Sequence, residues 1–222
     1  DLLKAIGKPK TTFIDKKNLS KKLNSALPKT HIALLNLIAQ HAHQQKTAIY
    51  IVGGFVRDLI LNRPSLDFDV VVEGDAIQFT QSLLKRFGGK VNTHKRFGTS
   101  KWNISEIHQN LKDLNPEFSD LDLSDLPETL DLISARTEFY DFPTALPQVE
   151  RSSIKLDLHR RDFTINTLAL RLDGNHYGEL YDYWGGLNDL REKQVRVLHS
   201  LSFVDDPTRK LRAARFEQHF KV

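Results

Sequence analysis

The pattern of hydrophobic and polar positions predicts helices and strands in alternation. Apolar residues at helical spacing favour a helix over residues 30–42, and the apolar run that ends at Gly53 favours a buried strand. A short helix over residues 55–62 and an apolar strand over residues 65–74 come next. Such alternation is typical of a mixed α/β (α+β) fold, here with a small sheet flanked by helices.

The pattern continues in the second half of the chain. Residues 75–89 favour a helix that ends on a glycine pair, residues 90–104 a strand or hairpin, and residues 130–140 a strand. The arginine-rich segment 160–172 predicts a further helix. Residues 105–128 are acidic and contain two prolines, which favours a loop insertion outside the core.

The two ends of the chain differ from this central part. Residues 1–28 are rich in lysine and lack a long apolar period, so we expect a linker or the tail of a preceding domain. Residues 29–199 are predicted as one domain, and residues 200–222 as the start of a helical part. An acidic pair before Pro207 favours a helix start there, because proline fits the first helical turn.

Composition narrows the classes of protein. The 222 residues include 32 Lys and Arg against 28 Asp and Glu, a net charge of only +4, but the isoelectric point of about 9.2 suits an anionic partner such as nucleic acid if the positive charge is clustered. There is no Cys, which excludes disulfides and thiolate chemistry, and we expect a cytoplasmic protein. No apolar run approaches the roughly 20 residues of a membrane helix. Because Met is absent even at position 1, we expect a piece of a longer protein.

The segment DFD carries the strongest chemical signal. On a strand, Asp67 and Asp69 would point to one side, about 6.6 Å apart along the chain, and Phe68 to the other. Two carboxylates so placed can share one or two divalent ions, as phosphoryl transfer requires. A solvent-facing strand edge is the alternative, but aspartate suits the start of so apolar a strand poorly unless a ligand holds it. We therefore predict Asp67 and Asp69 as metal ligands.

A glycine pair precedes this segment. Gly53 and Gly54 would let backbone N–H groups approach a phosphate, and the helix that follows would add its positive end. A dinucleotide-binding loop is the competing interpretation, but the stretch GGFVRD lacks the spacing G-x-G-x-x-G. The sequence therefore favours a phosphate-binding turn beside the metal site.

Two later acids compete for a third place in that site. Asp131 opens an aliphatic strand and is the preferred candidate, and Glu138 is the alternative. Arg136 shares the alternating set of Glu138 and could meet phosphate or form a salt bridge with the acids.

A carboxylate and a guanidinium share a helix face near the end of the chain. Asp206 and Arg209 are three residues apart, and together they offer the acceptors and donors that a base edge requires. A surface salt bridge is the alternative, and spacing alone favours the salt bridge. Lys210, Arg212 and Arg215 follow on the same helix, where they could face an RNA backbone or simply solvent.

Four ordered motifs resemble a known family. GGFVRD with DFD, RRDFTIN (160–166), YDYWGGLNDL (181–190) and DDPTRKLRAARF (205–216) are similar to the polymerase-β-like nucleotidyltransferases of the tRNA CCA-adding enzyme and bacterial poly(A) polymerase branch. The resemblance implies a nucleotidyltransferase head followed by a helical neck. It also implies Mg²⁺-dependent, template-independent addition of C, C and A from CTP and ATP to the 3′-hydroxyl of tRNA, with release of pyrophosphate.

The resemblance also implies roles for single residues. Asp162 would accept a hydrogen bond from the ribose, Arg161 would steady the triphosphate, and Asp206 with Arg209 would select the base. Asp205 stands where the family usually has Glu. The nucleotide-binding set implied in this way is Gly53, Gly54, Arg57, Arg161, Asp162, Asn166, Asp205, Asp206 and Arg209.

Other functions stay open at this point. A poly(A) polymerase, or an enzyme that adds only CC or only A, would carry the same motifs. A catalytically silent RNA-binding module is an alternative from another class. The presence of both Asp67 and Asp69 argues against it, because two mutually repelling carboxylates serve no purpose in a silent copy.

Overall fold

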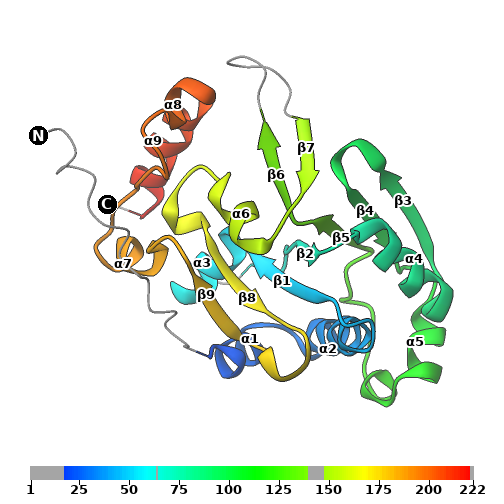
Figure 1. Cartoon of the computed structure of the whole chain (residues 1–222). Coiled ribbons are helices and arrows are strands. Elements are labelled where there is room, and N and C mark those ends of the chain that lie inside the picture. Colours follow the sequence, from blue (N-terminus) through cyan, green and yellow to red (C-terminus); the bar gives the residue numbers. More distant parts are fainter. Residues whose placement is uncertain (1–17, 64, 140–147, 221–222) are drawn as a thin grey trace, which may run out of the picture.

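A seven-stranded mixed sheet forms the centre of the fold (Figure 1). The computed structural model of the protein describes residues 18–63, 65–139 and 148–220. The strands are β1 (Ala48–Val52), β2 (Val70–Glu73), β3 (Lys90–His94), β4 (Thr99–Asn103), β5 (Thr129–Ser134), β6 (Arg136–Phe139), β7 (Gln148–Arg151), β8 (Leu168–Arg171) and β9 (Glu179–Asp182). The sheet has the order β3-β4-β5-β2-β1-β8-β9, in which β2 and β5 are parallel, and β6 pairs with β7 in a separate two-stranded sheet.

Helices flank this sheet, as the sequence predicted. Asp75 shows how they begin, because its side chain accepts hydrogen bonds from the backbone of Ile77 at 2.9 Å and Gln78 at 3.1 Å at the start of the fourth helix. The α-helices are α1 (Ser20–Ala26), α2 (Lys29–Gln44), α3 (Gly54–Ile60), α4 (Ala76–Phe87), α5 (His108–Leu114), α6 (Ile154–His159), α7 (Gly186–Arg191), α8 (Ser202–Asp205) and α9 (Thr208–Phe220). Within the described ranges, the helices are too short or too polar to cross a membrane.

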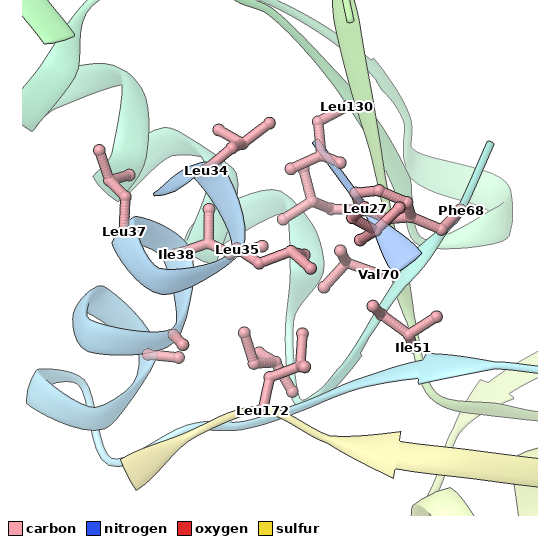
Figure 2. Close-up of a cluster of buried hydrophobic side chains, with 14 of the residues drawn as sticks. Leu27, Leu34, Leu35, Leu37, Ile38, Ile51, Phe68, Val70, Leu130 and Leu172 are labelled. Carbon is pink, nitrogen blue, oxygen red and sulfur yellow. The ribbon is translucent and has the colours of Figure 1, made fainter. Parts of the chain in front are cut away.

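The hydrophobic core lies on both faces of the sheet. Helix α2 packs Leu34, Leu35 and Ile38 against strands β1, β2 and β8 on one face (Figure 2). On the other face, Tyr50 and its neighbours pack against α6. Central strands covered on both sides need apolar residues at successive positions, which explains the unbroken apolar runs in β1 and β2. The predicted α/β fold with a mixed sheet is therefore confirmed.

The segment 160–172 is not the helix that the sequence predicted. Helix α6 ends at His159, residues 164–166 form one 3₁₀ turn, and residues 168–171 are the strand β8 between β1 and β9. The apolar residues from Leu168 to Leu170 are fully buried because both faces of β8 are covered. A buried strand and a buried helix give similar apolar runs, so the pattern misled the prediction.

Two further predictions about the periphery need correction. Residues 105–128 are not an insertion outside the core, since α5 and a 3₁₀ turn in this segment bury Leu111 and Phe118. Part of the predicted linker also belongs to the fold, because α1 buries Leu23 completely in the same core as α2. Residues 1–17 lie outside the described part of the chain.

Candidate active site

Two acidic residues stand at a cavity between the sheet and helix α3. Asp67 and Asp69 precede β2, which begins at Val70, so they are not on the strand itself as the sequence predicted. Both side chains are exposed, whereas Phe68 between them is buried in the core and anchors the segment (Figure 2). The cavity measures about 240 Å³, and its wall includes Gly54, Asp67, Asp69, Arg160 and Arg161.

A third acid, Asp131, lies next to this pair on β5. Strands β2 and β5 are parallel with Val70 opposite Leu132, so the residues just before them, Asp69 and Asp131, are also neighbours. Lys101 Nζ lies 3.2 Å from Asp131 Oδ2 and offsets part of the negative charge. Asp131 thus lies on a strand next to the acid pair, and its role as a third carboxylate stays a prediction.

Glu138, the alternative third acid, is engaged elsewhere. Its Oε1 accepts hydrogen bonds from Arg136 Nη2 and Arg160 Nη1, both at 3.0 Å, and its side chain is buried. Arg136 thus pairs with Glu138 rather than with the predicted metal ligands. This arrangement favours Asp131 over Glu138.

The acids at the cavity repel one another. Partial desolvation and then the charges of Asp131 and Asp67 raise the pKa of Asp69 above its ordinary value, against the attraction of Arg161 and Lys101. A divalent cation would relieve this repulsion. Among the described residues, the structure contains no group of three or more His, Cys, Asp or Glu side chains that could by itself hold a metal ion. The exposed acids instead suit Mg²⁺, which protein sites commonly hold through one or two carboxylates together with substrate phosphates and water.

Gly53 makes room for an arginine. A Cβ atom at this position would lie 2.7 Å from Arg161 Nη1, and the backbone has φ +72°, which favours glycine. The Gly53 N–H is donated to the carbonyl of Leu168 at 2.9 Å, so it is not free for a phosphate as the sequence analysis expected. Gly54, in contrast, lines the cavity.

The predicted ribose acid sits in a chain of hydrogen bonds. Asp162 Oδ1 accepts from Asn166 Nδ2 at 2.8 Å, and Asn166 Oδ1 accepts from Arg57 Nη1 at 2.6 Å. The Arg57 guanidinium also lies 5.0 Å from the centre of the Phe216 ring of α9. Arg57 therefore supports Asn166 and α9, and its guanidinium lies beside Gly54 of the cavity wall, where a Cβ atom on Gly54 would be 3.4 Å from Arg57 Nη2.

The predicted base-selecting pair lies where α8 meets α9. Asp206 accepts a hydrogen bond from the Thr208 N–H at 2.9 Å and so caps α9, which confirms a helix start after the acidic pair. Arg209 Nε lies 3.8 Å from Asp206 Oδ2, and Arg209 Nη2 donates to the carbonyl of Arg160 at 3.3 Å. Partial desolvation opposes ionisation of Asp206, but hydrogen bonds from Thr208 and the charge of Arg212 outweigh it and lower its pKa.

The basic residues of α9 fall into two groups. Lys210 and Arg215 are exposed, as a contact with RNA would require. Arg212 is also exposed, but it bridges two acids, with its Nε 3.1 Å from Asp162 Oδ2 and its Nη2 2.9 Å from Asp206 Oδ2. Asp205, which the sequence analysis also assigned to this region, is partly exposed, and its Oδ2 lies 3.7 Å from His199 Nε2.

The comparison with known proteins decides the family. The Poly A polymerase head domain matches residues 49–196, which run from β1 to the segment after α7. The chain belongs to this family. The site described above therefore occupies a poly(A) polymerase head domain, and the predicted family is confirmed.

Curated relatives of this head domain share much of the sequence. An A-adding tRNA nucleotidyltransferase of Geobacter sulfurreducens is 45% identical over 88% of this chain and 20% of its own length. An A-adding tRNA nucleotidyltransferase of Halalkalibacterium halodurans is 40% identical over 91% of this chain and 43% of its own. The chain thus spans less than half the length of these relatives.

Solved structures agree with this family. An apo form of a CCA-adding enzyme superposes with a TM-score of 0.77 and 40% identity over 91% of this chain and 43% of that one. A Thermotoga maritima CCA-adding enzyme in complex with tRNA and a CCA-adding enzyme in complex with ATP each give a TM-score of 0.72, at 36% and 37% identity. Each covers 92% of this chain, and the match spans 42% and 41% of the two solved chains. The predicted polymerase-β-like head is therefore confirmed as the fold.

This head domain also contains a residue that the sequence analysis missed. Asp157 on α6 is fully buried and contacts both arginines of the RRD motif. A signal existed, because Asp157 precedes Arg160 and Arg161 by three and four residues, the spacing of neighbours on one helix face.

Proposed function

We propose that this chain is the catalytic head of a tRNA nucleotidyltransferase that transfers AMP from ATP to the 3′-hydroxyl of tRNA. The main support for the proposal is the set of residues in the cavity wall, where two exposed aspartates and a pair of arginines line the same cavity. Acids for a metal ion and cations for a triphosphate are the two requirements of nucleotidyl transfer. The A-adding activity of the two curated relatives supports ATP as the donor.

The acids and the arginine at the cavity have different roles in the proposed reaction. Asp67 and Asp69 would hold Mg²⁺, with Asp131 as the third acid. When bound, the metal would activate the attacking hydroxyl and neutralise the pyrophosphate leaving group. Arg161 orients the triphosphate so that the 3′-oxygen of tRNA lies in line with the α-phosphorus. A bond forms between these two atoms as the bond to pyrophosphate breaks.

Recognition of the nucleotide falls to the segment from Asp162 to Arg209. Asp162, fixed by Asn166, accepts from the ribose hydroxyl. Asp206 accepts from the exocyclic amino group of the base, and Arg209 donates to ring acceptors. Residues 200–222, which include this pair, begin the helical neck, and the exposed Lys210 and Arg215 face the RNA backbone.

Addition of the whole C, C and A sequence is the second candidate function. The motifs of the sequence predicted it, and the solved structure at 40% identity is a CCA-adding enzyme. Transfer of AMP to a tRNA that already ends in CC is the step that both candidates share. The two differ only in whether CTP is also a substrate.

An assay of the full-length parent protein tests both candidates. The protein is incubated with Mg²⁺ and tRNA that ends either before CCA or after CC, with CTP and ATP singly and together, and the 3′ ends are sequenced. We expect one A on the tRNA ending in CC. Addition of C, C and A to the shorter tRNA would establish the second candidate, and long A tails would assign poly(A) synthesis. Binding of tRNA without incorporation would contradict the proposal.

A further inference from the structure

A single buried carboxylate holds three arginines beside the cavity. Asp157 is 0% exposed. Its Oδ1 accepts hydrogen bonds from the backbone N–H of Arg136 at 3.1 Å and from Arg160 Nη2 at 2.9 Å. Its Oδ2 accepts from Arg161 Nη2 at 3.2 Å. Both oxygens are therefore occupied by protein groups, which leaves Asp157 without a direct contact to substrate.

The charges around Asp157 do not balance. Among the described residues joined by these ion pairs, Asp157 and Glu138 contribute two negative charges, whereas Arg136, Arg160 and Arg161 contribute three positive ones. A buried charge needs partners, and this cluster supplies them with one cation in excess. Because Arg160 and Arg161 line the cavity, the excess positive charge stands where the proposed function requires an anion.

Of the three arginines, Arg161 is the one whose charge acts on a predicted metal ligand. Its charge acts on Asp69, and its Nη1 occupies the space that the absent Cβ of Gly53 leaves. Its Nε is buried and finds no hydrogen-bond partner among the described residues. The ion pair with Asp157 and the close approach to Gly53 together fix the direction of the guanidinium.

We propose that Asp157 is a positioning residue that holds Arg161 in the orientation in which it meets the triphosphate. This inference rests on the proposed function, because it assigns Arg161 to the phosphates of the donor nucleotide. Asp157 acts through Arg161 and touches no reacting atom. Arg160, which is shared between Asp157 and Glu138, keeps the carboxylate in place from the other side.

Asp173 offers a matched control for burial. It is also a buried aspartate that pairs with an arginine, since Arg171 Nη2 lies 2.9 Å from its Oδ2. Its Oδ1 accepts from the backbone of Ile49 at 3.1 Å, at the start of β1. Asp173 therefore has the same chemistry as Asp157 but belongs to neither the cavity wall nor the predicted nucleotide set.

The test compares ATP binding and turnover in the full-length protein. Kd for ATP, KM for ATP and kcat are measured for the wild type, Asp157→Asn, Arg161→Gln, the double variant and Asp173→Asn, with the melting temperature as a check of folding. We expect Asp157→Asn to raise Kd and KM for ATP at least 10-fold, because a misplaced binding group costs up to about 10²-fold. In the Arg161→Gln background the same substitution should add less than about 2-fold, since coupled residues are not additive. Asp173→Asn should lower the melting temperature and leave Kd for ATP within 2-fold.

Three outcomes would overturn the inference. They are an unchanged Kd for ATP in folded Asp157→Asn, an equal effect of Asp173→Asn, and full additivity in the double variant. If Asp157→Asn does not fold, Asp157→Glu takes its place, because it keeps the charge but shifts the carboxylate. This variant should fold and bind ATP more weakly than the wild type. Normal ATP binding by folded Asp157→Glu would also overturn the inference. ATP binding is read without tRNA, so failure of the wild type to extend tRNA would count against the proposed function alone.

Discussion

The acid side and the arginine side of the cavity are built in opposite ways. The acid side consists of Asp67 and Asp69, which are exposed, with Asp131 beside them. The arginine side consists of Arg160 and Arg161, whose side chains are 20% and 21% exposed and rest on the fully buried Asp157. The acids repel one another, whereas the arginines are already paired. We therefore expect the acid side to need a cation to complete it, whereas the arginine side is already held in place by protein groups.

Removal of one acid from the acid side should have the largest effect on activity. Asp69→Asn keeps the shape of the side chain but removes a predicted metal ligand, and a metal ion contributes several kcal/mol to such a transition state. We expect the rate of AMP transfer to fall by about 10³-fold or more, while the melting temperature without metal stays equal or rises. Initial rates and thermal melts check both results. A rate within 10-fold of the wild type would remove Asp69 from the metal site.

The substitution Gly53→Ala would disturb the arginine side. In Gly53→Ala the new Cβ would meet Arg161 Nη1 at 2.7 Å, and the positive φ adds backbone strain of about 1–3 kcal/mol. We expect kcat/KM for ATP to fall by about 10²-fold as Arg161 moves. Gly185→Ala is the matched control, because Gly185 has φ +78° but no atom within 4 Å of the added Cβ. It should lower the free energy of unfolding and leave kcat/KM unchanged; equal kinetic losses in both would exclude the displacement of Arg161 as the cause.

A substitution in helix α9 should have a smaller effect, on the choice of nucleotide. Arg212→Gln removes the bridge between Asp162 and Asp206, and each ion pair of so exposed a side chain contributes about 0.2–1 kcal/mol. We expect the preference for ATP over GTP to fall by about 10-fold, with the affinity for tRNA nearly unchanged. Arg215→Gln, at an exposed position of the same helix, should show the reverse pattern. Competition assays with mixed nucleotides and tRNA binding curves separate the two variants.

The smallest expected effect is on the pH dependence of stability. Because the pKa of Asp69 is raised in the folded state, the native protein holds this proton to a higher pH than the unfolded chain does. Asp69 therefore favours the fold at low pH, and this contribution is lost as the pH rises through the raised pKa. The melting temperature of the wild type minus that of Asp69→Asn should fall from acid to neutral pH, and Mg²⁺ should restore part of it. A difference that rises with pH would contradict the repulsion among the acids.

The sequence predicted the acid side better than the arginine side, for a physical reason. The spacing of Asp67 and Asp69 is local, and Asp131 begins a strand that the pattern also identified. The arginine side depends on tertiary contacts, such as the burial of Asp157 and the approach of Arg161 to Gly53. The sequence predicts that Arg212 faces RNA or solvent, because helix spacing does not show that its side chain lies against Asp162.

The dependence on tertiary contacts also explains why the sequence pattern predicted parts of the fold wrongly. Segment 168–171 is apolar on both faces because it is a central strand, and an apolar run alone does not separate a strand from a helix. Because residues 105–128 are acidic overall, their composition did not indicate that Leu111 and Phe118 are buried in the core beneath α4 and α2. Local patterns thus predicted which elements exist near the site, but not all of their types or partners.

Oxidative cleavage by a bound iron ion would show whether the acid side holds a divalent metal. Full-length protein is loaded with Fe²⁺ in place of Mg²⁺ and treated with ascorbate and peroxide, and the cut sites in the backbone are mapped by mass spectrometry. The account predicts cuts close to residues 67–69 and 131, suppressed by excess Mg²⁺ and absent in Asp69→Asn. Cuts confined to other parts of the chain, or an unchanged pattern in Asp69→Asn, would contradict it.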